Sequence, residues 1–435
     1  MQRKHVSLML LLVCGSLFGE DAAMFRGNPL HSGVYDGSAG AKVSGVKWKF
    51  HTGGMVIGSP SVAGGLLYAG STDGKLYAID AESGTLKWKF DAKSRVPSTP
   101  AIAAGMVYFT AYDGNLYALD AANGTLKWKF KTGGERRFAG KHLHGTQPLE
   151  ETMPDPFDCY LSSPVVWNGA VYFGSGDGNI YAVDAASGAM KWKVKTGDVV
   201  HASPAVAGGT LYVGSWDSFF YAVDAANGEV KWRFKTGEDH EIYNQVGIQS
   251  SAAVVDGMVY LGCRDSHLYA LDAASGEKRW AFDAKGSWVV GSPAVRDGKV
   301  YFPTSDSSLL YEVEAKTGKV LRSVGFNHWY LYSSPALAGD FLFIGSTQGK
   351  LFEVGLADMK PVWNYETDSA KQHSAEYMKA DGTPNGEALF RSDFYDDMVT
   401  GVERVMSMGS ILSSPVVLGR VVYVGSADGN VYALN

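Results

Sequence analysis

Large hydrophobic side chains alternate with charged ones along many short segments of this chain. In one such segment, Leu86, Trp88 and Phe90 alternate with Lys87 and Lys89. A period of two residues is typical of a β-strand with one face against the protein and the other in water. We therefore expect the three large side chains to pack between sheets. The two lysines should face solvent, where they also discourage edge-to-edge aggregation.

Four such strands follow one another in residues 59–90. The segments "SPSVAGG", "LLYAGSTDG", "KLYAIDAESG" and "TLKWKF" are separated by Gly-rich or Asp-Gly turns. Short turns of this composition join neighbouring antiparallel strands. The pattern predicts one four-stranded antiparallel blade.

The same unit recurs along the chain with a period of about 40 residues, and three junctions carry extra residues. A Ser-Pro or Thr-Pro pair marks the first strand of seven units, and Ala252 replaces the proline in one more. The prolines are Pro60, Pro100, Pro164, Pro204, Pro293, Pro335 and Pro415. The residue before each proline, and before Ala252, is small, as expected where eight strands converge on an axis: Ser59, Thr99, Ser163, Ser203, Ser251, Ser292, Ser334 and Ser414.

Each end of the chain carries part of a unit. The last unit stops at "GNVYALN" without a fourth strand, whereas "GVKWKF" at residues 45–50 is a fourth strand with no unit before it. Joined, they complete an eighth blade and close the ring. The prediction is an all-β fold, an eight-bladed β-propeller that forms a single domain over residues 24–435.

The repeated phrase resembles that of a known family. "AVDAASGAMKW" at 182–192, with close copies at 78–88, 118–128, 222–232 and 270–280, is similar to the repeat of the quinoprotein propellers, called the PQQ-like repeat. "MFRGNPLHSG" at 24–33 resembles the N-terminal segment usual in that family. The resemblance implies the propeller fold. It leaves function open, because the family includes PQQ-dependent alcohol dehydrogenases and non-enzymatic scaffolds, such as the propeller lipoprotein of the outer-membrane barrel-assembly machine.

Positions within the phrase have structural explanations. Asp184 and Gly188 flank a tight turn, where the carboxylate accepts backbone N–H groups and the glycine can adopt a positive φ. Trp192 is expected to fill the gap to the next blade. The sixth unit departs from the pattern, with Glu314 in place of the aspartate and Arg322 in place of the tryptophan.

The first residues indicate export. Arg3 and Lys4 precede an apolar run from Val6 to Phe18, which is too short to span a bilayer but suits a secretory signal peptide over residues 1–23. Cleavage after Ser16, Gly19 or Ala23 would fit equally: the sequence does not choose among them. We expect a periplasmic or secreted protein with no transmembrane segment.

Three cysteines bear on processing and redox state. Cys14 raises the possibility of a lipid anchor, but "LLVC" has valine where a lipoprotein signal normally has a small residue, so no anchor is expected. Cys159 and Cys263 lie in different repeats, and the sequence leaves open whether they pair.

With a net charge of −6, the chain offers no global positive field for nucleic acid or an anionic membrane.

The extra residues fall at 131–160, 235–248 and 366–411, each between the last strand of one blade and the first strand of the next. In a four-stranded blade, this loop opens on the same face as the turn between the second and third strands. The three insertions should therefore crowd one face of the ring. Loops on a rigid scaffold are where binding residues concentrate.

Side chains near the axis of this face also depart from the repeat. In the turns between second and third strands, larger residues replace small ones: Tyr112, Trp216, Arg264 and His267. Just before the inner strands, three blades carry polar or aromatic residues where others have aliphatic ones or proline: His201, Gln249 and Tyr332. These residues predict a polar and aromatic pocket over the central channel, mainly from blades 3 to 5. The alternative is that they are scattered surface substitutions.

The first insertion contains "GGERRFAGKHLHG". Arg136 and Arg137 suit a carboxylate or a carbonyl-rich ligand, or else they tie the loop to neighbouring aspartates. His142 and His144 could assemble a metal site with the nearby acidic residues and cysteine: Asp155, Asp158 and Cys159. No spacing typical of a metal motif supports such a site, and none is expected.

The third insertion has nine acidic residues against four basic ones, a balance of −5 that is nearly the whole net charge of the protein. Its segment "GEALFRSDFYDDMVTGVERVM" mixes aromatic residues, methionine and charge at roughly helical spacing. This pattern suits a lid or a docking arm. A solvated loop with one short helix would have the same composition.

Two functions follow from these features. The resemblance makes a PQQ-dependent dehydrogenase possible, with the cofactor and Ca²⁺ on the axis. Asp217 or Asp265 would then serve as base or ligand, Arg264 would lie near the quinone oxygens, and Trp216 would stack on the ring. However, the chain lacks the adjacent cysteines of the alcohol dehydrogenases and any CxxCH haem site. We therefore favour an exported binding or scaffold module whose decorated face recognises an envelope protein or a small ligand.

Overall fold

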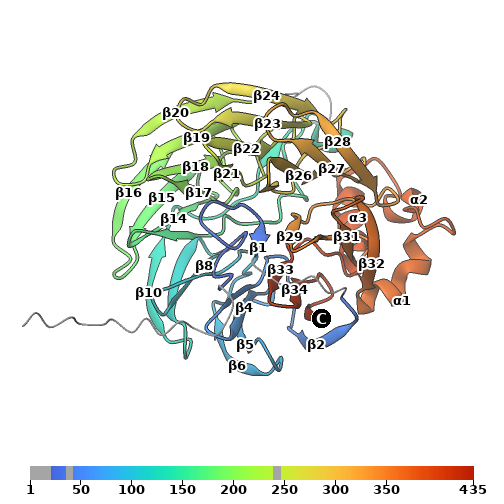
Figure 1. Cartoon of the computed structure of the whole chain (residues 1–435), viewed down its shortest axis with the longest axis horizontal. Coiled ribbons are helices and arrows are strands. Elements are labelled where there is room, and N and C mark those ends of the chain that lie inside the picture. Colours follow the sequence, from blue (N-terminus) through green and yellow to red (C-terminus); the bar gives the residue numbers. More distant parts are fainter. Residues whose placement is uncertain (1–20, 36–42, 239–245) are drawn as a thin grey trace, which may run out of the picture.

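The computed structural model describes residues 21–35, 43–238 and 246–435. These residues form eight antiparallel sheets arranged around a central axis as the blades of a propeller (Figure 1). This arrangement confirms the predicted fold. The predicted signal peptide and Cys14 lie outside the described residues, apart from residues 21–23.

Within each blade the strands are ordered from the axis outward, and consecutive strands pair. Blade 1 comprises β3 (Ser61–Ala63), β4 (Leu66–Gly70), β5 (Lys75–Asp80) and β6 (Leu86–Asp91). Blade 2 comprises β7 (Ala101–Ala103), β8 (Met106–Ala111), β9 (Asn115–Asp120) and β10 (Leu126–Lys131). Blade 3 comprises β13 (Val165–Trp167), β14 (Ala170–Gly174), β15 (Asn179–Asp184) and β16 (Met190–Lys195). Blade 4 comprises β17 (Ala205–Ala207), β18 (Thr210–Gly214), β19 (Phe219–Asp224) and β20 (Val230–Lys235).

The remaining blades follow the same plan. Blade 5 comprises β21 (Ala253–Val255), β22 (Met258–Gly262), β23 (His267–Asp272) and β24 (Lys278–Asp283). Blade 6 comprises β25 (Ala294–Arg296), β26 (Lys299–Pro303), β27 (Leu309–Glu314) and β28 (Val320–Gly325). Blade 7 comprises β29 (Ala336–Ala338), β30 (Phe341–Gly345), β31 (Lys350–Gly355) and β32 (Lys360–Glu366). Blade 8 comprises β33 (Val416–Leu418), β34 (Val421–Gly425), β35 (Asn430–Leu434) and β2 (Val46–His51).

Blade 8 closes the ring as predicted. Its three inner strands come from the end of the chain, and the outermost strand, β2, pairs antiparallel with β35 in the register Lys49↔Tyr432. The C-terminus therefore lies beside β2 (Figure 1). Pairing strands from the two ends of the chain leaves the ring without an open blade.

The tryptophans hold adjacent blades together. Trp192 donates its indole N–H to the Ala225 carbonyl of the next blade at 3.0 Å, and the Tyr172 hydroxyl donates to the same oxygen at 3.0 Å. Five other blade junctions repeat this pair of bonds, at the carbonyls of Ala81, Ala121, Ala185, Ala273 and Ala315. The turn glycine has φ +73° at Gly188, where a Cβ atom would meet the Trp128 ring. These contacts confirm the structural reading of the repeated phrase.

Blade 6 keeps the junction by other chemistry. Arg322, which takes the place of the tryptophan, donates to the backbone carbonyls of Leu356 and Ala357 in blade 7 at 2.8 and 2.6 Å. Its charge is matched by Glu312, whose carboxylate also pairs with Lys299 at 2.7 Å. An arginine thus replaces one indole donor with two guanidinium donors.

One expectation for the outer strands is wrong. Leu86 is 43% exposed, although Trp88 and Phe90 of the same strand are partly buried as predicted. A bulge in β6 lies between Leu86 and Trp88 and breaks the alternation at that point.

The small residues at the axis form a closed hydrogen-bonded ring. Each backbone N–H donates to the hydroxyl of the corresponding residue in the next blade, over distances of 2.8–3.2 Å. The last bond, from Ser414 to Ser59, completes the circle. These positions therefore need a hydroxyl as well as a small side chain.

The N-terminal segment runs across the inner strands. Backbone carbonyls of residues 22–33 accept hydrogen bonds from the first strands of six blades, those of Val62, Ile102, Val206, Val254, Val295 and Leu337. The segment ends in β1 (Val34–Tyr35), which pairs parallel with β29. Because Ala22 accepts one of these bonds, cleavage before residue 21 would keep the segment whole, whereas cleavage after Ala23 would shorten it.

The three insertions follow the fourth strands β10, β20 and β32 of their blades. Residues 131–160, called insertion 1, contain the two-stranded sheet of β11 (Ala139–Gly140) and β12 (Met153–Pro154) and the short 3-10 helix η1 (Leu143–Gly145). Residues 366–411, called insertion 3, form α1 (Asp368–Tyr377), α2 (Gly386–Leu389) and α3 (Tyr395–Ser407) beside blade 7 (Figure 1). Among the described residues, no helix has the length and apolar character to cross a membrane.

Candidate functional site

Insertion 1 folds over the mouth of the central channel on the face of the ring that carries the three insertions, called the decorated face. Eight residues just before the inner strands line this mouth, one from each blade: Ile57, Pro97, Leu161, His201, Gln249, Val290, Tyr332 and Leu412. Three of them are the predicted polar and aromatic positions. Phe157 and Asp158 of insertion 1 contact these three side chains, so the chain covers part of the mouth where a pocket was predicted.

The first anchor of insertion 1 is a buried ion pair. Arg264 Nη1 donates to Asp155 Oδ2 at 2.6 Å, and both side chains are at most 1% exposed. His144 Nε2 lies 3.2 Å from the other oxygen, Asp155 Oδ1. Burial alone would raise the pKa of the Asp155 carboxyl, but the Arg264 charge and His144 outweigh this effect and hold the pKa well below its usual range. The carboxylate is therefore ionised at neutral pH.

The Arg264 guanidinium lies between two indoles. Its central carbon is 4.6 Å from the centroid of the Trp216 ring and 3.9 Å from that of Trp288. Cation–π contact of this kind stabilises a desolvated charge. The other face of Trp216 is covered by Phe138 of insertion 1, stacked at 4.5 Å.

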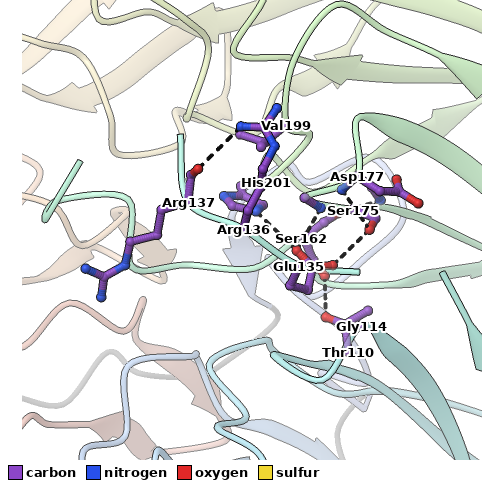
Figure 2. A network of polar contacts seen from close by, with 12 residues as sticks. Thr110, Gly114, Glu135, Arg136, Arg137, Ser162, Ser175, Asp177, Val199 and His201 are labelled. Carbon is purple, nitrogen blue, oxygen red and sulfur yellow. Dashed lines mark hydrogen bonds and ion pairs between the residues drawn. The ribbon is translucent and has the colours of Figure 1, made fainter. Parts of the chain in front are cut away.

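The second anchor is a buried histidine between two carboxylates. His201 Nδ1 lies 2.7 Å from Asp158 Oδ1, and its Nε2 lies 3.4 Å from Glu135 Oε2. Burial alone would lower the pKa of His201, but the two carboxylates raise it to about 10. Glu135 also accepts from the Ser175 hydroxyl at 2.9 Å and the Gly176 N–H at 2.7 Å (Figure 2). The imidazolium thus ties both ends of insertion 1 to blades 3 and 4.

Uncharged contacts complete the seal. Gln249 donates its amide N–H to the Phe157 carbonyl at 3.0 Å, and the Phe157 ring stacks on Tyr332 at 5.9 Å. Tyr160 donates to the Leu412 carbonyl at 3.1 Å. Six predicted site residues therefore meet around insertion 1, namely His144, His201, Trp216, Gln249, Arg264 and Tyr332.

The other predicted residues lie elsewhere. Asp217 and Asp265 lie in the turns between the second and third strands of their blades. Each accepts a hydrogen bond from the hydroxyl of the tyrosine four residues later, as the equivalent aspartates of other blades do. His267 is partly exposed and stacks on Tyr269. Two residues of insertion 1 form ion pairs at its surface, Arg136 with Asp198 at 2.7 Å and His142 with Glu150 at 3.0 Å.

The structure also bears on the possible metal site and the possible disulfide. In the part of the chain that the structure describes, no group of three or more His, Cys, Asp or Glu side chains is arranged to hold a metal ion. Cys159 and Cys263 are free thiols. Burial raises the pKa of Cys159 to about 12 and that of Cys263 well above its usual value. Both thiols are therefore protonated at neutral pH.

The residues near the axis do not fit a quinone. A stacking indole needs a free face, but Trp216 lies between Phe138 and Arg264. Arg264 is buried and already neutralised by Asp155. The carboxylates of Asp217 and Asp265 are engaged by tyrosine hydroxyls and backbone N–H groups.

A separate hollow of about 360 Å³ opens between α3 and blades 8, 1 and 2; we call it the α3 pocket. Its polar lining includes Arg95, Tyr112, Arg137 and Glu403. Its apolar lining includes Met55, Ile57, Pro97, Val399, Val402 and Met406. Two predicted residues, Tyr112 and Arg137, therefore line this pocket and do not take part in the Asp155 and His201 clusters.

The sequence analysis missed several residues of both places. Glu135, Phe138 and Phe157 contact the axial side chains, yet nothing in a repeat comparison singles out residues of a unique insertion. Trp288, which lies in the loop between blades 5 and 6, was also missed. Asp155 and Asp158 were noted only as possible metal ligands, and the structure pairs them with Arg264 and His201 instead. Arg95 could have been found, because it occupies the blade-to-blade loop on the decorated face.

Comparison with known proteins agrees with the fold. A family model, PQQ_2, described as outer membrane protein assembly factor BamB, matches residues 33–148, 160–282 and 243–435. No curated protein matches the sequence. Among solved structures, BamB from Moraxella catarrhalis is 16% identical with a TM-score of 0.64, over 91% of this chain and 98% of that one.

Enzymes of the same architecture are equally similar. A europium-containing methanol dehydrogenase is 14% identical with a TM-score of 0.69, over 95% of this chain and 98% of that one. The quinohemoprotein alcohol dehydrogenase from Comamonas testosteroni is 16% identical with a TM-score of 0.67, over 95% of this chain and 80% of that one. At these identities the likeness concerns the fold alone.

Proposed function

We propose that this chain, which belongs to the PQQ_2 family of the outer membrane protein assembly factor BamB, is an exported binding or scaffold module. Its decorated face would dock a protein of the cell envelope. The observation that carries the proposal is the fixation of insertion 1 by two buried ionic clusters, those of Asp155 and His201. A loop held in this way is preorganised, so binding a partner costs little ordering of the loop.

The surface where insertions 1 and 3 meet offers the best anchor for a partner. Phe394 is 58% exposed, the most exposed of the large hydrophobic side chains described. The backbone on either side of it is fixed, because the Gln147 N–H donates to Asp393 at 2.7 Å and the Tyr395 N–H donates to Gln147 at 2.9 Å. Exposed aromatic side chains on a fixed backbone are typical interface hot spots.

The charge around this anchor indicates the chemistry of the partner. Asp393 and Asp396 are exposed beside Phe394, and insertion 3 as a whole has nine acidic and four basic residues. A complementary partner surface would present a hydrophobic pocket with a basic rim. The description of the family points to proteins that take part in outer membrane protein assembly as the first class to test.

Site-specific photo-crosslinking in cells tests this proposal. A photoreactive residue at Phe394 is expected to give one dominant adduct with an envelope protein, and the Phe394→Ala change should weaken binding of the purified partner at least about tenfold. Ala186, exposed in a turn on the opposite face, is the matched control position and should give no such adduct. Equal adducts from both positions, or none from Phe394, would contradict the proposal.

A further inference from the structure

We infer that the α3 pocket binds a small amphipathic carboxylate, with the anionic group at Arg137 and Arg95 and the apolar portion along α3. This site adjoins the channel mouth at Ile57 and Pro97 but does not include the Asp155 and His201 clusters or the exposed surface around Phe394. The inference does not depend on the proposed docking function, since a pocket ligand could be present with or without a protein partner.

The cationic end of the pocket is built from three donors. Arg137 and Arg95 line it together with Tyr112, whose buried hydroxyl interacts with the Arg137 guanidinium. Within the described ranges, neither guanidinium has a carboxylate at ion-pair distance. Burial raises the pKa of Tyr112 to about 12, so its hydroxyl stays protonated and can donate.

The neighbouring arginine shows the contrast. Arg136 pairs with Asp198 at 2.7 Å, whereas the Arg137 side chain extends away from the Glu135–His201 contacts (Figure 2). A planar guanidinium matches the two oxygens of a carboxylate. Two cationic groups in one hollow, on a protein of net charge −6, favour an anion there over a neutral ligand.

The rest of the pocket is apolar. Val399, Val402 and Met406 recur at helical spacing along α3 and face Met55 and Pro97 across the hollow. A hollow of about 360 Å³ is at the small end of the size range for ligand sites. Apolar walls with a few placed polar groups are the usual design of such sites, because burial gives affinity and the polar groups fix orientation.

One acidic residue tunes the site. Glu403 lines the same pocket from α3 and is exposed. Its charge opposes an anionic ligand, so its removal should strengthen binding. Removing the Glu403 charge and removing an arginine charge should therefore change the affinity for an anionic ligand in opposite directions.

Calorimetric titration with decanoate, and with decanol as the neutral isostere, tests the inference. Decanoate is expected to bind with one site per chain and decanol at least about tenfold more weakly, since decanol lacks the charge that strengthens hydrogen bonds to the guanidinium groups. Arg137→Gln should weaken decanoate at least about tenfold and leave decanol unchanged. Glu403→Gln should strengthen decanoate and leave decanol unchanged.

Arg136→Gln is the matched control, because it removes an adjacent arginine that points away from the pocket. It should leave decanoate affinity unchanged, and thermal unfolding of each variant verifies that the fold is retained. Equal binding of decanoate and decanol would overturn the inference, as would equal effects of Arg136→Gln and Arg137→Gln. Absence of decanoate binding to the unmodified protein would overturn it as well.

Discussion

Replacing Asp155 by asparagine is expected to lower the free energy of unfolding by about 3–5 kcal/mol, the usual cost of removing one partner from a buried ion pair. Asparagine has nearly the same shape, but it leaves the Arg264 charge buried without its counter-ion. The loss should appear in urea unfolding followed by tryptophan fluorescence, since Trp216 and Trp288 contact Arg264. Amide exchange in residues 131–160 should rise at the same time, because the pair anchors this insertion.

Asp198→Asn provides the control for this change. It removes the exposed ion pair with Arg136 from the same insertion and should cost less than about 1 kcal/mol. Combining Asp155→Asn with Arg264→Met should recover part of the stability, because no buried charge is then left unpaired. Equal costs for Asp155→Asn and Asp198→Asn would show that the buried pair does not anchor the insertion.

The second large effect is a loss of stability at alkaline pH. The pKa of His201 is raised from 6.5 to about 10 in the folded protein. A raised pKa means that the folded state binds the proton more tightly than the unfolded state, so the contribution is full below about pH 6.5 and disappears as the pH rises through 10. Between these values the free energy of unfolding should fall by up to about 1.4 kcal/mol per pH unit.

The His201→Gln variant separates this effect from other titrations. It should be less stable than the unmodified protein at pH 6.5 and show a nearly flat profile up to about pH 8. Above that, stability falls in both proteins, because the pKa of the buried thiols of Cys159 and Cys263 is raised from 9.0. Tyrosines such as Tyr112, whose pKa burial raises to about 12, affect stability only above that window. His31, buried beside Arg26 with its pKa lowered to about 3, acts on the acid side. An unchanged slope in the variant would contradict the assignment of the charge to His201.

The repeat made most of the fold predictable. A tryptophan every 40 residues or so implies the same junction each time, and the strand at Val46–His51 had no other place than blade 8. The junction after blade 6 could not be predicted from the tryptophan pattern. There Arg322 donates hydrogen bonds to the next blade from its guanidinium group in place of an indole N–H. The Leu86 error has a similar origin: a bulge changes the alternation without any mark in the sequence.

The site was only half predictable for a physical reason. Departures from the repeat correctly singled out His201, Arg264 and Trp216 as unusual, because regular blades have smaller or apolar residues there. What they contact was not predictable, since Arg264 is paired with Asp155, 109 residues away in a segment that occurs once.

The central proposal is that the protein acts by binding on the face that carries the insertions, with insertion 1 covering part of the channel mouth at the axis. Calorimetric titration of the purified protein with PQQ, with and without Ca²⁺, tests this proposal most directly, with a quinoprotein apoenzyme as the positive control. The account predicts no binding in either condition. Tight Ca²⁺-dependent binding that is lost in the Arg264→Ala variant would contradict it and identify the axis as a cofactor site.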